Sequence, residues 1–174
     1  YSSVYSRDYP MTETHEQVIT RWYADDAKLK LRTTYPLTSD SVVVDLGAYQ
    51  GAWCSDIYDL YKCRIIALEP MLEFYHMLKD RIKDTSIEAL PLAAGGSTRQ
   101  DFIYDLGDGS SLCETGPKSH TINVLSFADL MKKCKLTHIS LLKMNIEGAE
   151  FELLEHLIDK KLLSKIDHLQ IQFH

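Results

Sequence analysis

The sequence has few of the features that mark several common protein classes. Only four cysteines occur among its 174 residues, and no two of them form a CxxC pair. This spacing argues against a zinc site, and a disulfide framework is not typical of a domain of this size. We therefore expect Cys54, Cys63, Cys113 and Cys134 to be buried or incidental thiols in a reducing compartment.

Long apolar runs and an excess of positive charge are also missing. The apolar runs are short and interrupted by charges, so neither a signal peptide nor a membrane span is predicted. The net charge is −6, whereas non-specific nucleic-acid binding requires a basic face. These absences favour a cytoplasmic protein without a nucleic-acid partner. Because the first residue is Tyr1, we expect the chain to be a piece of a longer polypeptide, with its other domains as possible partners.

The residues that are present predict one α/β domain after an N-terminal segment. Residues 1–40 are expected to form an arm and a helix over 14–31, and residues 41–174 the main domain. From residue 41, apolar runs of strand length alternate with amphipathic stretches, which is typical of βαβ units and a parallel sheet with helices on both faces. Strands are expected at 41–46, 63–70, 86–95, 138–146 and 166–174, and helices at 52–62, 71–82, 126–134 and 148–163.

The alternation stops between residues 99 and 125. Two further strands are predicted at 99–104 and 120–125, so an inserted β-hairpin is expected beside the main sheet. Between them lies a Gly/Ser-rich segment, for which we expect a lid or acceptor loop over 107–119. Ser110 and Ser111 are its candidate substrate-binding residues.

The stretch DLGAYQG, residues 45–51, follows the first strand directly. Ligands of doubly wound sheets bind outside the carboxyl ends of the strands, where this stretch lies. Gly47 permits backbone conformations closed to other residues, and Gly51 permits close packing of helix on strand. The dinucleotide fingerprint GxGxxG is absent, and Asp45 would repel phosphate but could bind an ammonium group. A helix-starting turn with an incidental Asp is the alternative.

Glu69 ends the second strand in the sequence LEP, followed by Pro70. An acid about 20 residues past a glycine loop commonly binds two ribose hydroxyls. A ligand with an ammonium group and a ribose, but without a pyrophosphate, is S-adenosylmethionine. The alternative for Glu69 is an ordinary helix cap.

A second group of polar residues surrounds the end of the fourth main strand, in LLKMNIEGAE. Lys143 lies within an apolar strand, where an unpaired ammonium would be costly, so we expect it to pair with a carboxylate or reach the strand end. Asn145, Glu147 and Glu150 follow where strand turns into helix. Complementation of the helix dipole explains one of these acids well, but the whole group less well.

These motifs resemble those of the FkbM-type S-adenosylmethionine-dependent methyltransferases. The resemblance runs from about Val42 to His174 and is carried by VVVDLGAYQG, LEP, LPLAAG, GSSL, INVLSFADL, LLKMNIEGAEFELLE and the terminal QIQFH. The DxGAxxG loop marks many methyltransferases, whereas KMNIEGAE is far more specific. The resemblance implies a class I methyltransferase fold, Rossmann-like, and two further strands beyond His174 that the chain lacks.

The resemblance also implies the roles of individual residues. The cofactor S-adenosylmethionine would be bound by a set of residues drawn from four strand ends: Asp45, Gly47, Ala48, Tyr49, Gln50, Gly51, Glu69, Pro70, Leu92, Ala93, Ala94 and Asn145. The family usually has Asp at the position of Asn145 and commonly Glu at that of Gln172. A neutral amide removes a ligand for a hard cation, so no metal is expected.

The expected reaction is methyl transfer to a hydroxyl of a sugar, glycan or related polyol. A general base would take the hydroxyl proton, with Glu147, Glu150 and His174 as candidates, Asn145 beside them and Lys143 orienting one of them. One alternative is amino-group methylation, which the acidic charge and the lack of an NPPY-like motif disfavour. The other is a non-catalytic cofactor-binding module of a larger glycan-assembly protein.

Overall fold

The computed structural model describes residues 14, 20, 27–104 and 119–174 of the chain. They belong to two compact units, Tyr1–Tyr35 and Pro36–His174. In the first unit the helix α2 spans Ala27–Thr33 and ends two residues later than the sequence predicts. The expected arm, and most of the expected helix over 14–31, lie outside the described residues.

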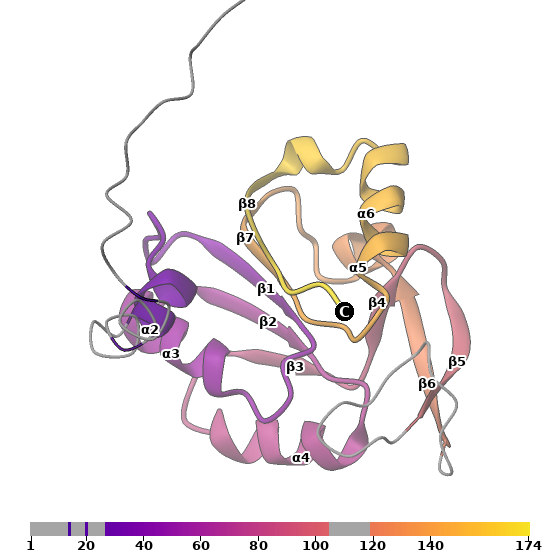
Figure 1. The fold of residues 1–174 in the computed structure, drawn as a ribbon, viewed down its shortest axis with the longest axis horizontal. Helices are drawn as coiled ribbons and strands as arrows, with labels where there is room; N and C mark the ends of the chain where they lie inside the picture. The colour runs from indigo at the N-terminus through magenta and orange to yellow at the C-terminus, as the bar shows by residue number, and fades with distance from the viewer. Residues whose placement is uncertain (1–13, 15–19, 21–26, 105–118) are drawn as a thin grey trace, which may run out of the picture. The chain divides into compact units, whose positions relative to one another are not determined.

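The second unit contains a five-stranded sheet in the order β3-β2-β1-β7-β8, in which every pair of neighbours is parallel (Figure 1). Helices connect these strands, so the expected α/β architecture with a parallel sheet is confirmed. The strands are β1 (Val42–Leu46), β2 (Arg64–Leu68), β3 (Glu88–Leu90), β7 (Ile139–Met144) and β8 (Ile166–Ile171).

The register places the carboxyl ends of all five strands in one row. Leu46 lies opposite Leu68 on one side and Met144 on the other. Leu68 lies opposite Leu90, and Met144 opposite Ile171. The residues that follow these strand ends are therefore brought to the same edge of the sheet, although they are far apart in the sequence.

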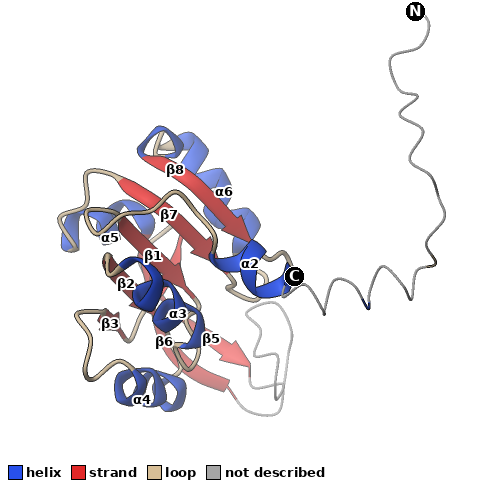
Figure 2. Ribbon diagram, turned by 90° about the vertical axis from the view of Figure 1, so that its left-hand side faces the viewer, coloured by secondary structure: helices blue, strands red, loops and turns tan. Residues whose placement is uncertain are grey.

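Four helices cover the two faces of the sheet: α3 (Ala52–Tyr61), α4 (Leu72–Arg81), α5 (Phe127–Lys133) and α6 (Glu150–Asp159). Figure 2 shows α3 in front of the sheet and α6 behind it. This arrangement follows from right-handed crossovers, because the strand order reverses its direction of growth at β1. A short 3-10 turn, Leu163–Lys165, leads into β8. None of the described helices has the length and apolar character needed to cross a membrane.

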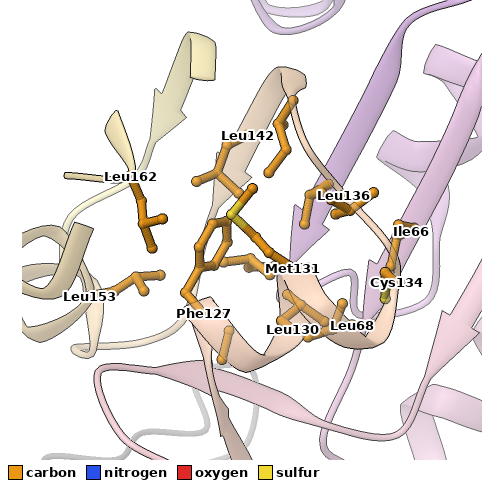
Figure 3. Close-up of a cluster of buried hydrophobic side chains, with 14 of the residues drawn as sticks. Ile66, Leu68, Phe127, Leu130, Met131, Cys134, Leu136, Leu142, Leu153 and Leu162 are labelled. Atoms are coloured by element: carbon orange, nitrogen blue, oxygen red, sulfur yellow. The ribbon is translucent and has the colours of Figure 1, made fainter. Parts of the chain in front are cut away.

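The main core lies between the sheet and the helices α5 and α6. Alternate strand residues face it, as the pleat of a β-strand requires, among them Val44, Leu46 and Leu142. Phe127 of α5 lies in the middle of this cluster, with Met131 of the same helix and Leu153 of α6 beside it (Figure 3).

A second, three-stranded sheet interrupts the βαβ pattern, in the order β4-β6-β5. Its strands are β4 (Ala93–Gly95), β5 (Arg99–Tyr104) and β6 (Ser119–Ser126). β5 and β6 are antiparallel, which confirms the expected hairpin. The loop predicted to act as a lid, with Ser110 and Ser111, lies outside the described residues except at its end.

The prediction of one strand over residues 86–95 is wrong. The segment forms β3 and β4, which belong to different sheets and are separated by Pro91. Proline has no backbone N–H to donate to a ladder and is seldom found inside a sheet. The chain leaves the main sheet there and joins β6 instead.

Candidate functional site

The turn after β1 is closed by a direct backbone contact with the end of β7. Gly47 has a φ of 73°, and a Cβ atom there would lie 1.9 Å from the carbonyl oxygen of Asn145. The amides of Gly47 and Ala48 both donate to the carbonyl oxygen of Leu68, at 3.0 and 2.9 Å. Only glycine fits this conformation and this contact, so Gly47 joins the ends of three neighbouring strands.

Asp45 and Lys143 form a buried ion pair beneath this turn. They lie opposite each other on β1 and β7, and Lys143 Nζ is 2.8 Å from Asp45 Oδ1. The same ammonium donates to the carbonyl oxygen of Gly47 at 2.8 Å and lies 5.8 Å from the centre of the Trp53 ring. The expectation that Lys143 pairs with a carboxylate is confirmed. Through these contacts Lys143 links β7 to Asp45 of β1 and to Gly47 in the turn that follows.

Two buried acceptor groups remain unsatisfied at this position. The Asp45 side chain is 0% exposed. Neither of its oxygens has a hydrogen-bond partner among the described residues, and the same holds for Asn145 Oδ1. Asp45 Oδ1 is in ion-pair contact with Lys143 Nζ at 2.8 Å, so Asp45 Oδ2 and Asn145 Oδ1 are the two buried oxygens without any polar partner among the described residues. Buried acceptors without donors are costly, and a ligand with an ammonium group would satisfy them.

Glu69 connects the turn after β1 with the start of α4. Its Oε2 accepts the Tyr49 amide at 2.9 Å, and its Oε1 accepts the Met71 amide at 2.9 Å. Burial raises the pKa of Glu69, which these two amide hydrogen bonds oppose. A carboxylate can accept about four hydrogen bonds, so each oxygen keeps one lone pair for a further donor such as a hydroxyl.

The remainder of the turn is held by packing against α4. Gly51 has a φ of 80°, and a Cβ there would lie 2.5 Å from a Leu78 methyl group. The carbonyl oxygen of Gln50 accepts a hydrogen bond from Arg81 at 2.7 Å. Tyr49 also has a positive φ, 52°, and its exposed ring lies 4.4 Å from that of Phe74. The turn is therefore fixed at several points before any ligand binds.

The turn after β7 is organised by Glu150, the first residue of α6. This side chain is 0% exposed, and its two oxygens accept the amides of Ile146 at 2.8 Å and Gly148 at 3.0 Å. Glu147 and Gly148 have positive φ values of 54° and 102°. Glu150 therefore holds the tight turn that contains Glu147.

His174 approaches both acids of this turn from the end of β8. Its Nδ1 lies 3.2 Å from Glu150 Oε1, and its Nε2 lies 3.5 Å from Glu147 Oε2. The side-chain nitrogen of Gln172 lies 3.1 Å from the same Nε2. Asn145 completes the group, with its side-chain nitrogen 3.5 Å from Glu147 Oε1. The three candidate bases thus meet at one place, although 27 residues separate Glu147 from His174 in the sequence.

The other expected cofactor residues lie close to the same sheet edge. Pro70 follows Glu69, and Leu92 follows the end of β3 by two residues. Ala94 is buried in the main core and Ala93 in a second cluster, so these two residues can present only backbone to a ligand. The sequence analysis did not include Trp53 among the site residues, although its ring lies near Lys143. Its position in the first turn of α3, directly after a glycine loop, was the feature that could have indicated it.

The described cysteines and acidic residues show neither a reactive thiol nor a metal-binding group. Burial, followed by the neighbouring Asp45, raises the pKa of Cys54 to about 12, so its thiol is not ionised at neutral pH. Cys63 and Cys134 are also free and buried, as expected, whereas Cys113 lies outside the described residues. No group of three or more His, Cys, Asp or Glu in the described part of the chain is arranged to hold a metal ion.

The fold and the polar groups at the sheet edge define the class of protein. A mostly parallel sheet flanked by helices, with an acidic glycine turn after β1 and a carboxylate after β2, is the arrangement of a Rossmann-like methyltransferase. The family model described as the methyltransferase FkbM domain matches residues 45–174, and the chain belongs to that family. Membership implies S-adenosylmethionine as the methyl donor. Neither the curated proteins nor the solved structures contain a match to the chain.

Proposed function

We propose that the chain transfers a methyl group from S-adenosylmethionine to a hydroxyl of a sugar, glycan or related polyol. The observation that carries the proposal is the set of acceptor groups at the carboxyl edge of the sheet. Asp45 Oδ2 and Asn145 Oδ1 are buried there without a polar partner among the described residues, and Glu69 keeps free lone pairs beside them. The donor molecule brings the complementary groups, an ammonium and two ribose hydroxyls.

The residues present fit this cofactor. Asp45 and Asn145 would hold the ammonium group, and the turn over Gly47, Ala48 and Gly51 would enclose the methionine end. Glu69 would accept hydrogen bonds from the ribose, whereas Leu92–Ala94 would lie beside the adenine. Lys143 is the charge partner of Asp45 in this buried position, 2.8 Å from Oδ1.

When bound, S-adenosylmethionine supplies a methyl group on a sulfonium sulfur, which retains the electron pair of the broken C–S bond. The chain's own residues position the acceptor and take up its proton. Positioning alone can contribute about 7–11 kcal/mol to barrier reduction. Proton removal adds about 10²–10⁴-fold, and the groups available for it are Glu147, Glu150 and His174.

The type of acceptor follows from the chemistry around these three residues together with the family resemblance. Carboxylate, imidazole and amide groups are suited to bind and deprotonate a neutral hydroxyl. The net charge of −6 disfavours the polyanionic backbone of a nucleic acid. A sugar or polyol presents several hydroxyls to such a polar group and carries no charge that the two acids would repel.

Replacement of Glu69 tests the cofactor site. We expect Glu69→Ala to weaken S-adenosylmethionine binding by about 1.5–3 kcal/mol, the range for hydrogen bonds to a charged group. Titration calorimetry measures this change. Glu73→Gln, which alters an exposed acid in the first turn of α4, is the matched control and should bind normally. Unchanged affinity in a folded Glu69→Ala variant would exclude the ribose role.

Turnover separates an enzyme from a non-catalytic module. Labelled S-adenosylmethionine is incubated with methyl glycosides of the common hexoses and deoxyhexoses, and separately with simple amines, and transfer of label to each acceptor is measured. Methylation of one sugar supports the proposal. Tight cofactor binding without methylation of any glycoside or of simple amines would favour the cofactor-binding module instead.

A further inference from the structure

We infer that Glu150 and His174 form a carboxylate–imidazole dyad, in which His174 Nε2 takes the acceptor proton and Glu150 positions the ring. This assignment rests on the proposed function, and it separates the roles of three residues that sequence reasoning left equivalent. His174 is the catalytic residue of the dyad, and Glu150 is a positioning residue that acts through it.

Glu150 is excluded as the base itself by its surroundings. Its Oε1 accepts the Ile146 amide and lies 3.2 Å from His174 Nδ1, so both lone pairs of this oxygen are engaged. Both oxygens already accept backbone amides, from Ile146 at 2.8 Å and Gly148 at 3.0 Å. These bonds fix the carboxylate in one orientation, which is the property required of a group that orients an imidazole.

We assign the ring proton of neutral His174 to Nδ1, because the carboxylate contact at that nitrogen is the shorter one, 3.2 Å against 3.5 Å at Nε2. Nδ1 lies 3.2 Å from Glu150 Oε1, and an ionised carboxylate can only accept, so Nδ1 is the donor. In the neutral ring Nε2 then has a lone pair, and the side-chain amide of Gln172, 3.1 Å away, donates to it. The His174 side chain is 27% exposed, and in the proposed reaction an acceptor hydroxyl would replace Gln172 as the donor to this nitrogen.

Glu147 is placed to stabilise the ring after proton uptake. Its Oε2 lies 3.5 Å from Nε2, the nitrogen that becomes an N–H donor when the imidazolium forms. In the reaction the hydroxyl oxygen gains the methyl group while its proton passes to Nε2, and the imidazolium later releases this proton to water. Between Glu147 and Glu150, the positive ring faces a carboxylate at each nitrogen.

A second pair on the same two strands provides an internal control. His138 precedes β7 and Asp167 lies near the start of β8, so both are at the opposite edge of the sheet. There the contact runs through the other nitrogen, with His138 Nε2 2.7 Å from Asp167 Oδ2. The two histidines should therefore have opposite neutral tautomers, with the proton on Nδ1 in His174 and on Nε2 in His138.

Nitrogen-15 NMR of the histidine rings tests the dyad without cofactor or acceptor. The pH is raised until the nitrogen chemical shifts no longer change, so that the neutral rings are observed. The His174 and His138 signals are assigned by their loss in His174→Gln and His138→Gln. We expect the Nδ1–H form for His174, and a mixture of tautomers in Glu150→Gln. An Nε2–H form of His174 in the unaltered chain would overturn the inference, as would a tautomer that Glu150→Gln leaves unchanged.

Kinetics on the methyl glycoside panel provide the second measurement. We expect His174→Gln to lower kcat by about 10²–10⁴-fold with unchanged affinity for S-adenosylhomocysteine, while His138→Gln retains full activity. Glu147→Gln should lower kcat less than His174→Gln does. A larger loss in Glu147→Gln would assign the base to Glu147 and overturn the dyad. Failure of cofactor binding in the unaltered chain, with the expected tautomers present, would contradict the proposed function but not the Glu150–His174 geometry.

Discussion

Gly47 holds the site together at the scale of a single residue. Its missing side chain lets the turn after β1 lie against the carbonyl group of Asn145, and its carbonyl oxygen accepts a hydrogen bond from Lys143. A larger residue would have to displace backbone rather than a movable side chain. The same residue thus determines the shape of the turn after β1 and its distance from the residues after β7.

We expect Gly47→Ala to lower stability and cofactor affinity together. A left-handed backbone costs a non-glycine residue about 1–2 kcal/mol, and the Cβ would lie 1.9 Å from a carbonyl oxygen. Urea denaturation and titration calorimetry measure the two effects. In the control Gly96→Ala, the nearest atom is a Glu152 side-chain oxygen at 3.0 Å, which can move. Equal losses in the two variants would show that Gly47 has no special role.

At the scale of elements, the start of α5 is fixed by a cluster of short hydrogen bonds. Ser126 caps the helix by accepting the Asp129 amide at 3.2 Å, and its hydroxyl donates to the Asp129 carboxylate at 2.7 Å. Thr98 donates to the same carboxylate at 3.0 Å. This cluster links the segment before β5 to the helix that carries Phe127 into the core.

The Asp129 cluster gives a prediction about acid stability. Hydrogen bonds from Ser126, and then from Lys132 and Thr98, lower the pKa of Asp129 from 3.8 to about 2. A lowered carboxylate pKa stabilises the fold above the unfolded value, and this contribution is lost as the pH falls through the folded value. Asp129→Asn should therefore lower the urea midpoint at neutral pH, and the difference from the unaltered chain should shrink between pH 3.8 and about 2.

Asp56→Asn is the control for this experiment, because it removes one carboxylate from the exposed side of α3. If the deficit of Asp129→Asn stays constant down to pH 2, the ionised form of Asp129 is not the stabilising species.

A second link between elements joins the inserted sheet to α6. Arg99 of β5 contacts Glu152 through two nitrogens, at 2.8 and 3.0 Å, and Glu152 also accepts the Gly96 amide at 3.0 Å. Because Glu150 and Glu152 lie in the same first turn of α6, this contact helps fix the helix end whose Glu150 contacts His174. The insertion thereby supports the site as well as extending the fold.

At the scale of the whole second unit, one core holds the sheet and the two helices α5 and α6 together. Phe127 is fully buried in it and contacts both layers (Figure 3). The positions of the residues at the carboxyl edge depend on this packing, because α6 begins with Glu150 and β7 ends just before Asn145.

Truncation of Phe127 should therefore destabilise the unit strongly. We expect Phe127→Ala to lower the free energy of unfolding by about 3–5 kcal/mol, because it removes a buried ring and leaves a cavity. Urea denaturation measures this loss. Phe102→Ala, on β5 where the ring is 54% exposed, should cost far less. A loss in Phe127→Ala no larger than that control would show that the core closes around the gap.

Much of the architecture could be predicted from local sequence patterns. Apolar runs of strand length, glycine turns and amphipathic helices predicted β1, β2, β7, β8 and the four covering helices within a few residues, because burial on a two-faced sheet requires those patterns. The cost of an unpaired ammonium inside an apolar strand left two expectations for Lys143, pairing with a carboxylate or reaching the strand end, and the structure shows the pairing with Asp45. The division of residues 86–95 did not follow, because the strand partner of Ala93 and Ala94 is β6, about 30 residues further along.

The roles that we propose for the individual site residues could be assigned only from the tertiary structure. The sequence placed Asp45, Glu69 and Glu150 at strand or helix ends, but it could not show that Lys143 neutralises Asp45 or that Glu150 is fully buried. It also could not show that His174 contacts Glu150 through Nδ1 and Glu147 through Nε2. These facts depend on the parallel register that brings the ends of β1, β7 and β8 into one row, and register arises from the packing of the whole sheet rather than from any one segment.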